Sequence, residues 1–131
     1  MSYQTTIEIR GYHCDSYGHV NNARYLELFE EARWQALKES GIQSLASAKG
    51  YLFFIVNLEV SFKRPILLDS QIQISTSVKE INNRMITFNQ EIYGPNDELC
   101  TTASIRFVLF DKKVKKSATI SEEVKSWFNA F

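Results

Sequence analysis

The stretch from Tyr12 to Leu37 reads YHCDSYGHVNNARYLELFEEARWQAL, a short polar segment that leads into a long amphipathic pattern. In its second half, apolar residues recur at spacings of three and four, which is typical of a helix with one broad apolar face. The residues of this face are Tyr25, Leu26, Leu28, Phe29, Ala32, Trp34, Ala36 and Leu37. The pattern therefore predicts a helix that the rest of the chain must cover.

Both ends of this predicted helix carry boundary signals. Asn21 is suited to cap the start, because its side chain can accept a hydrogen bond from an N–H of the first turn. The amides of Asn22, Ala23 and Arg24 would then begin the helix. Gly41 is well placed to end it. At roughly 1.5 Å per residue, such a helix would be about 27 Å long.

Asp15 lies in the polar segment, seven residues before the predicted first turn. A helix N-terminus offers free N–H groups and a partial positive charge, which can polarise a carbonyl oxygen. A carboxylate directed at the same point can attack the carbonyl carbon or activate a water molecule. The alternative is that Asp15 is a loop or cap residue, since aspartate is common in turns.

Composition limits the possible functions. The chain has 131 residues, of which 44% are apolar, so it suits a single domain (residues 1–131) with its own core. Its 15 basic and 15 acidic residues cancel, which argues against a general nucleic-acid binder. Two cysteines in no metal or redox spacing, no membrane span and no signal-peptide core predict a cytoplasmic protein.

Alternation of polar and apolar residues predicts five strands. The first covers residues 3–10, and a loop through Gly50 separates the long helix from the other four. These four follow one another as a meander, with turns at Asn82-Asn83 and at residues 94–97. They cover residues 52–63, 72–78, 86–92 and 99–110. So many consecutive strands exclude an alternating β-α-β arrangement.

The strand over residues 52–63 is apolar on both faces in its first half, which predicts cover on both sides there. Strict alternation divides its side chains into two sets. Phe53, Ile55 and Asn57 begin one set. The other set contains Leu52, Phe54, Val56, Leu58, Val60 and Phe62.

The C-terminal residues predict a short helix, with Ser121 as its cap and Val124, Trp127, Phe128 and Phe131 on one face. The fold class is therefore α+β, a curved antiparallel five-stranded sheet wrapped around one long central helix, with a short C-terminal helix. Such a sheet leaves an edge strand unpaired and an outer face that is partly apolar. Both features favour association with another copy.

Two segments resemble a known family. The sequence DSYGHVNNARYLELFEEARW, from Asp15 to Trp34, resembles the signature of hotdog-fold acyl-CoA thioesterases of the 4-hydroxybenzoyl-CoA thioesterase type. Within that group it is most similar to bacterial long-chain acyl-CoA thioesterases. VNLEVSFKRPI, from Val56 to Ile66, resembles the strand that follows the helix in that family, and the element order fits over essentially the whole chain.

The resemblance implies a catalytic carboxylate at Asp15 and a polarising helix amide at Asn22. It also implies hydrolysis of a thioester by water to free acid and coenzyme A, with no metal or organic cofactor. His19 matches a histidine that many relatives carry, and it is a candidate for direct catalysis, for orienting Asp15 or for a structural role. The site would lie between two subunits of a homodimer, and many relatives form homotetramers.

Candidate substrate-binding residues are Lys63, Arg64, Asn57 and Tyr25. Lys63 and Arg64 suit the phosphates of coenzyme A, as do Arg84 and Arg106, although each is as easily a solvated strand residue. The cluster Phe53, Phe54 and Ile55 is either core or the lining of an acyl tunnel. No metal site is predicted, because the spacing of His13, Cys14, Asp15 and His19 fits no standard zinc pattern.

The expected function is hydrolysis of medium- to long-chain fatty acyl-CoA to free fatty acid and coenzyme A. Three alternatives remain open: a thioesterase that acts on acyl carrier protein, a non-catalytic hotdog protein that binds acyl-CoA, and a hotdog dehydratase. A carrier-protein enzyme would be expected to show a basic surface, which this neutral chain does not indicate globally. The position of Asp15 before the helix argues against the last two.

Overall fold

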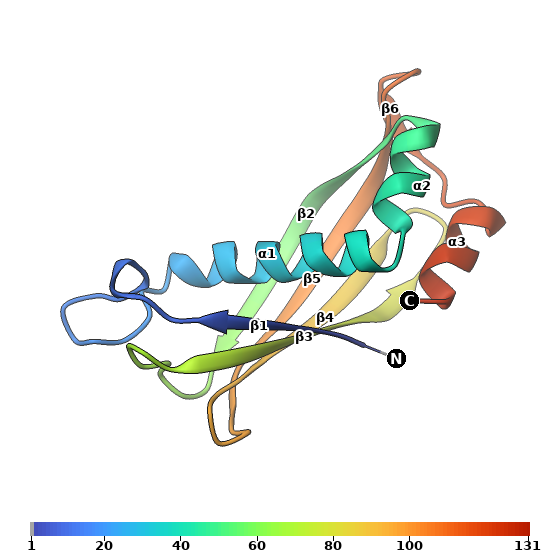
Figure 1. Cartoon of the computed structure of the whole chain (residues 1–131). Coiled ribbons are helices and arrows are strands. Elements are labelled where there is room, and N and C mark those ends of the chain that lie inside the picture. Colours follow the sequence, from blue (N-terminus) through green and yellow to red (C-terminus); the bar gives the residue numbers. More distant parts are fainter. Residues whose placement is uncertain (1) are drawn as a thin grey trace.

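The computed structural model describes residues 2–131 and contains one curved sheet with a long helix across its inner face (Figure 1). All strand pairs are antiparallel, and neighbouring strands follow the order β1-β3-β4-β5-β2. The short strand β6 pairs with the end of β5, at Leu109–Asp111. The strands are β1 Tyr3–Glu8, β2 Tyr51–Phe62, β3 Gln71–Ile81, β4 Ile86–Tyr93, β5 Leu99–Asp111 and β6 Lys116–Ala118. The helices are η1 Gly11–His13, α1 Arg24–Glu39, α2 Ile42–Lys49 and α3 Glu122–Asn129.

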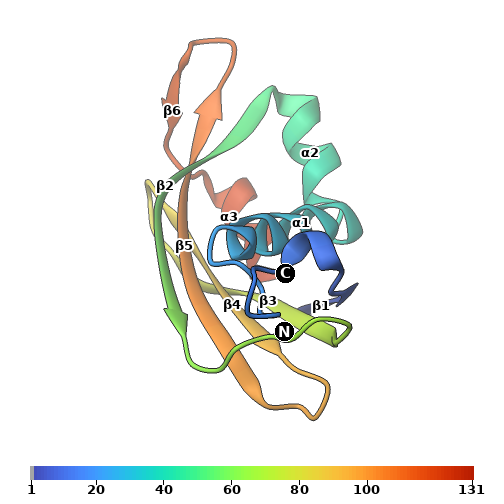
Figure 2. The same ribbon diagram turned by 90° about the vertical axis from the view of Figure 1, so that its left-hand side faces the viewer.

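Figure 2 shows the sheet curling around α1, which lies in its concave side. This confirms the predicted α+β class and the central helix. Three elements were not predicted, and the first is the short 3₁₀-helix η1 within the polar segment. The segment assigned to a loop before Gly50 forms the helix α2, and a short strand β6 raises the number of strands from five to six.

The ends of α1 agree with the sequence signals to within two residues. Asn21 Oδ1 accepts a hydrogen bond from the Ala23 N–H at 3.0 Å, and its carbonyl oxygen accepts one from the Arg24 N–H at 2.9 Å. Asn21 thus stabilises the turn into the helix, although regular α-helix begins at Arg24 rather than Asn22. Gly41, with φ +81°, ends it in the left-handed conformation as predicted.

The predicted apolar face of α1 is only partly buried. Tyr25, Phe29 and Ala32 pack against the sheet with the rest of the core, but Leu26 is 46% and Trp34 is 49% exposed. The apolar face of α1 is therefore wider than the part of the helix that the rest of the subunit buries.

A β-bulge changes which side chains of β2 face the helix. Ile55 pairs with Phe107 and Asn57 pairs with Arg106, so Val56 is an extra residue in β2. Strict alternation breaks at this point. The sequence-based division of β2 into two faces is therefore wrong. The side chains that pair with inward-facing residues of β5 are Phe53, Ile55, Leu58, Val60 and Phe62.

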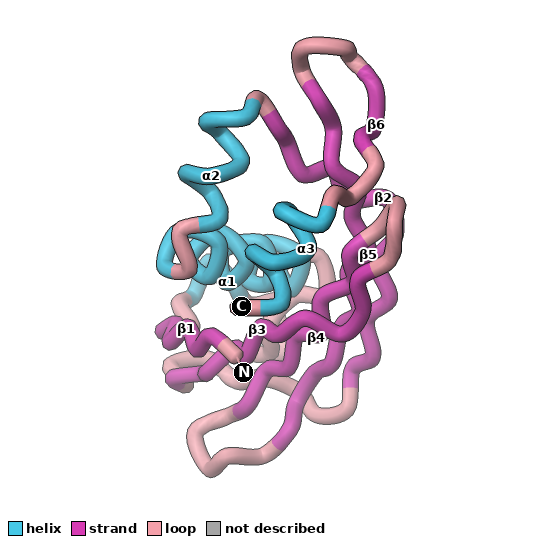
Figure 3. The backbone as a smooth tube through the Cα atoms, turned by 90° about the vertical axis from the view of Figure 1, so that its right-hand side faces the viewer, coloured by secondary structure: helices cyan, strands magenta, loops and turns pink. Residues whose placement is uncertain are grey.

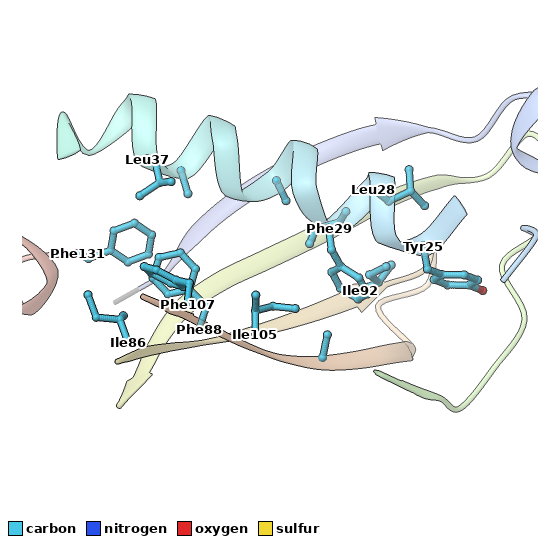
Figure 4. Packing of buried hydrophobic residues seen from close by; sticks show 14 of the residues in the cluster. Tyr25, Leu28, Phe29, Leu37, Ile86, Phe88, Ile92, Ile105, Phe107 and Phe131 are labelled. Carbon is cyan, nitrogen blue, oxygen red and sulfur yellow. The ribbon is translucent and has the colours of Figure 1, made fainter. Parts of the chain in front are cut away.

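Helix α3 lies at the end of the fold where the C-terminus is found (Figure 3), and aromatic rings fill the core near Phe131 (Figure 4). The Phe88 ring lies 4.8 Å from that of Phe107, edge to face, and 5.0 Å from that of Phe131, stacked. Phe128 of α3 packs against both Phe88 and Phe107. The Ser121 hydroxyl accepts a hydrogen bond from the Val124 N–H at 3.2 Å, which confirms the predicted cap of α3.

Candidate active site

A groove of about 270 Å³ brings together three segments that are distant in the chain. The polar loop before α1 contributes one wall, the first turns of α1 contribute another, and the end of β2 closes the third side. The groove is lined by Asp15, His19, Val20, Asn22, Tyr25, Phe62, Lys63, Arg64 and Pro65. Six of these nine residues were selected from the sequence as catalytic or substrate-binding candidates.

The loop that carries Asp15 is held by its own backbone. The Asp15 N–H donates to the His19 carbonyl oxygen at 2.8 Å, and the Gly18 N–H donates to the Asp15 carbonyl oxygen at 3.1 Å. Gly18 adopts φ +76°, a conformation that glycine takes without strain. Cys14 and Val20 form an isolated bridge at the base of the loop. These contacts fix the Asp15 Cα relative to the start of α1.

One carboxylate oxygen of Asp15 is used to orient the side chain. Asp15 Oδ1 accepts hydrogen bonds from the Tyr17 N–H at 2.9 Å and from the His19 N–H at 3.4 Å. Among residues 2–131, Oδ2 has no donor. A carboxylate held in this way keeps one oxygen free to accept a proton or to attack an electrophile.

The backbone amide of Asn22 is the second polar group of the groove. Its neighbours are engaged, because the Asn21 N–H donates to the His13 carbonyl oxygen at 2.8 Å and the Ala23 N–H donates to Asn21 Oδ1. The Asn22 N–H has no acceptor within the part of the chain that the structure describes. It lies at the electropositive start of α1, as an oxyanion donor requires.

Tyr25 and Phe62 form the apolar floor between the helix and β2. Their rings pack edge to face with centroids 4.9 Å apart, and Tyr25 is almost completely buried. Burial raises the pKa of the Tyr25 hydroxyl, and the neighbouring polar groups of Thr101 and Ile66 offset part of this change. The hydroxyl therefore stays neutral at physiological pH.

Lys63 and Arg64 bring positive charge to the far side of the groove. Their N–H groups both donate to the Cys100 carbonyl oxygen, at 2.8 and 3.0 Å, which fixes the backbone while the side chains remain exposed. Neither side chain forms an ion pair within residues 2–131. They are free to bind an anionic ligand such as a phosphate.

Other candidates lie outside the groove. Asn57 pairs with Arg106 across β2 and β5, after the bulge has turned it away from α1. Arg84 belongs to the turn between β3 and β4, where its guanidinium contacts the Thr119 hydroxyl at 3.5 Å. Val20, Phe62 and Pro65, which line the groove, were not selected from the sequence. No local sequence pattern distinguishes an apolar side chain that lines a groove from one that lies in the core.

A second hollow of about 90 Å³ lies between α1 and β2. Phe53 and Ile55, two candidates for an acyl tunnel, line it. Phe54 does not, because it points to the opposite face of the sheet and stacks on Phe110 with centroids 4.7 Å apart. The full lining is Glu30, Arg33, Trp34, Leu37, Phe53, Ile55, Phe88 and Phe107.

Other reactive groups near the groove are poorly suited to catalysis. Burial and the nearby Asp15 and Asp69 carboxylates raise the pKa of the Cys14 thiol, which disfavours a nucleophilic thiolate.

Residues 2–131 contain no group of three or more His, Cys, Asp or Glu side chains arranged to hold a metal ion. Within the same range, no helix has the length and apolarity needed to span a membrane.

A curved antiparallel sheet around a central helix, with a carboxylate and a helix-start amide in one groove, defines a hotdog-fold thioesterase. The chain belongs to the Thioesterase-like superfamily, whose family model matches residues 9–128. It is 37% identical over 123 residues to the long-chain acyl-CoA thioesterase FadM of Escherichia coli, with 93% of each chain covered. This membership confirms the resemblance that the two sequence segments indicated.

Two further comparisons extend this result. The crystal structure of the YbaW Probable Thioesterase from Escherichia coli superimposes with a TM-score of 0.89 at 36% identity, over 95% of this chain and 94% of that one. The chloroplastic acyl-acyl carrier protein thioesterase ATL2 of Arabidopsis thaliana is 27% identical over 131 residues, which cover 98% of this chain and 69% of the relative.

Proposed function

We propose that this protein hydrolyses medium- to long-chain fatty acyl-CoA to a free fatty acid and coenzyme A. One observation carries the proposal: Asp15 and Asn22 line the same groove, and among residues 2–131 neither Asp15 Oδ2 nor the Asn22 N–H has a hydrogen-bond partner. A base or nucleophile on one side and an oxyanion donor on the other are the two groups that thioester hydrolysis needs. The 37% identity to FadM supports acyl-CoA as the substrate class.

Asp15 can act in two ways. As a general base it takes a proton from water, and the resulting hydroxide attacks the thioester carbon. As a nucleophile its free oxygen attacks that carbon and forms a mixed anhydride, which water then hydrolyses. In both routes the Asn22 N–H stabilises the oxyanion, the C–S bond breaks, and coenzyme A leaves as a thiolate that takes up a proton. A burst of thiol ahead of fatty-acid release marks the nucleophilic route.

The remaining residues of the groove suit the carrier. We assign Lys63 and Arg64 to the phosphates of coenzyme A, because both line the groove with Asp15 and neither forms an ion pair among residues 2–131. Tyr25 forms the apolar floor on which the acyl thioester rests. His19 lines the groove and donates its backbone N–H to Asp15, so we assign it a positioning role. Asn57 is not part of this proposal, because it lies outside the groove.

The edge strand β2 favours a homodimer. It is a 12-residue strand with no partner on its outer side within residues 2–131, and Val56 and Phe62 are 53% and 52% exposed. An open edge with apolar side chains is a template for pairing with a second copy. The stacked Phe54 and Phe110 on the outer face offer a further surface for a tetramer.

We place this enzyme in the cytoplasm, as composition and cysteine content predict.

An acyl carrier protein is the second candidate carrier, because ATL2, named for that substrate, matches 98% of this chain. Carrier proteins are expected to meet basic surfaces, whereas the formal net charge here is +0. Hydrolysis of one acyl group presented on coenzyme A and on the carrier protein separates the two. Faster hydrolysis from the carrier protein at equal concentration would overturn the choice of coenzyme A.

The primary test is a thiol-release assay with acyl-CoA substrates from short to long chains. We expect turnover that rises with chain length into the medium and long range, since apolar side chains line the route between α1 and β2. No thiol release from any chain length would refute the proposed activity. Preference for the shortest chains would refute the substrate range while leaving the reaction type intact.

A further inference from the structure

His13 lies at the base of the loop that carries Asp15, and its backbone is engaged on both sides. Its N–H donates to the Arg10 carbonyl oxygen at 3.0 Å, and its own carbonyl oxygen accepts the Asn21 N–H at 2.8 Å. The first bond closes the short helix η1, and the second joins the two ends of the loop. Through His13, η1 is therefore tied to the residue that leads into α1.

The imidazole ring of His13 makes a third contact within the same turn. Its Nδ1 accepts a hydrogen bond from the Arg10 N–H at 2.8 Å. The backbone N–H and the ring of His13 thus bind the carbonyl oxygen and the N–H of one residue, a reciprocal arrangement that fixes the turn from both sides. Nδ1 can accept this bond only while it carries no proton.

The direction of the Asn22 N–H depends on the peptide unit that it shares with Asn21. This unit is planar, and its N–H and its carbonyl oxygen point to opposite sides. The carbonyl oxygen accepts the Arg24 N–H at 2.9 Å, and the N–H of Asn21 is held by the His13 carbonyl oxygen. A shift of that oxygen would therefore displace the amide that we assign to the oxyanion.

The His13 ring is half-buried beside a second groove, of about 440 Å³, between β1 and α1. The Tyr12 ring packs on it with centroids 4.3 Å apart. Burial lowers the pKa of this imidazole, Arg24 and Arg10 lower it further, and Glu27 offsets part of the change. The ring is therefore neutral, and able to accept a hydrogen bond, at neutral pH. The charged residues that line this groove are Glu8, Arg10, Arg24, Glu27 and Glu31.

We propose that His13 is a positioning residue, whose unprotonated Nδ1 holds η1 and thereby sets the direction of the Asn22 N–H. This inference rests on the function proposed above and adds to it a residue from outside the groove, since the groove that contains Asp15 is lined by other side chains. In this scheme His13 exchanges no proton with the substrate. Protonation of the ring removes the acceptor, loosens η1 and lowers kcat.

The test compares His13→Ala, which removes the acceptor, with His13→Asn. Asparagine places an amide oxygen close to the position of Nδ1 and can accept the same bond, but it does not titrate. We expect kcat to fall about tenfold in His13→Ala, as for the loss of one hydrogen bond, with KM within about twofold of wild type. His13→Asn should restore most of kcat. Tyr12→Leu removes the stacked ring but neither hydrogen bond, and should leave kcat unchanged.

The pH profile separates this role from a merely structural one. As the pH falls from about 7 to 5, kcat of the wild type should decrease because the ring takes up a proton, whereas His13→Asn should keep its plateau. Full kcat in folded His13→Ala, or the same acid limb in wild type and His13→Asn, would overturn the proposal. If His13→Ala does not fold, as judged by circular dichroism, the comparison of wild type with His13→Asn across pH decides.

Hydrogen exchange of the Asn21 N–H provides a readout that does not depend on turnover. This N–H should exchange several-fold faster in His13→Ala than in wild type, because its acceptor is then held less firmly, and His13→Asn should restore the slower rate. Equal exchange rates in the three proteins would overturn the proposal. If the wild type releases no thiol from any acyl-CoA, the proposed function fails, while the exchange rates still decide whether His13 holds the start of α1.

Discussion

The ring of Tyr25 lies edge to face against the ring of Phe62, with centroids 4.9 Å apart. This contact joins the first turn of α1 to the last residue of β2, beneath the groove that holds Asp15 and the Asn22 amide. Lys63 and Arg64 follow Phe62 directly, so the same contact sets where their charges lie. One aromatic pair, with Tyr25 buried and Phe62 half exposed, therefore connects the start of α1 to the strand end that carries these two cations.

Replacing Asp15 by asparagine should abolish most turnover while the fold survives. The amide oxygen can still accept the Tyr17 and His19 N–H bonds, but it is neither a base nor an effective nucleophile. We expect a decrease in kcat of about 10²–10⁴-fold with acyl-CoA binding retained. The control Asp97→Asn changes an exposed turn residue and should keep full activity. Near-normal turnover of Asp15→Asn would refute the role of Asp15.

The role assigned to the Asn22 amide concerns the backbone, so side-chain replacement alone does not test it. Asn22→Pro removes the N–H, and proline is tolerated at the start of a helix. We expect kcat to fall about 10²–10³-fold in Asn22→Pro. Asn22→Ala, which keeps the N–H, should retain most activity. Equal rates for the two variants, with equal melting temperatures, would remove this amide from the mechanism.

Tyr25 should make the stability of the protein fall at alkaline pH. Burial raises its pKa in the folded state, so the folded protein holds this proton more tightly than the unfolded chain does. The stabilisation is complete below the unfolded pKa of about 10 and is lost as pH rises through the higher folded value. Denaturant unfolding between about pH 9 and 11 should show a smaller loss for Tyr25→Phe. Tyr12→Phe, at an exposed tyrosine, should behave as wild type.

Gly41 and Gly11 offer a matched pair for backbone conformation. A Cβ would meet no atom within 4 Å at either position, but only Gly41 has a positive φ. Gly41→Ala should therefore lower the free energy of unfolding by about 1 kcal/mol, whereas Gly11→Ala should cause no loss. Equal effects of the two substitutions in urea unfolding would show that φ does not govern the end of α1.

Phe88 should be among the most costly core residues to truncate. It is fully buried and packs against Phe107, Phe128 and Phe131. Phe88→Ala is expected to lower the free energy of unfolding by about 3–5 kcal/mol. Val114→Ala, at an exposed turn, should change it by less than about 0.5 kcal/mol. A loss below about 1 kcal/mol for Phe88→Ala would contradict the central place of this ring in the core.

The elements that the sequence predicted correctly depend on local patterns. The periodicity of residues 24–39, the capping contact of Asn21 and the left-handed Gly41 are determined by neighbours along the chain. The same is true of the distance in sequence between Asp15 and the helix start. For this reason the fold class and the two reacting groups of the groove could be proposed before any coordinates.

Other features depended on contacts between distant segments. The bulge at Val56 arises from pairing with β5, and beyond Val56 it exchanges the two faces that alternation assigned to β2. Leu26 and Trp34 belong to the apolar pattern of α1, yet the fold of the subunit leaves about half of each side chain exposed. Only the tertiary structure brought Lys63 into the same groove as Asp15 and left Asn57 outside it. Backbone conformation follows from short-range sterics and hydrogen bonds, whereas strand register and the cover of each face are settled when the whole chain packs.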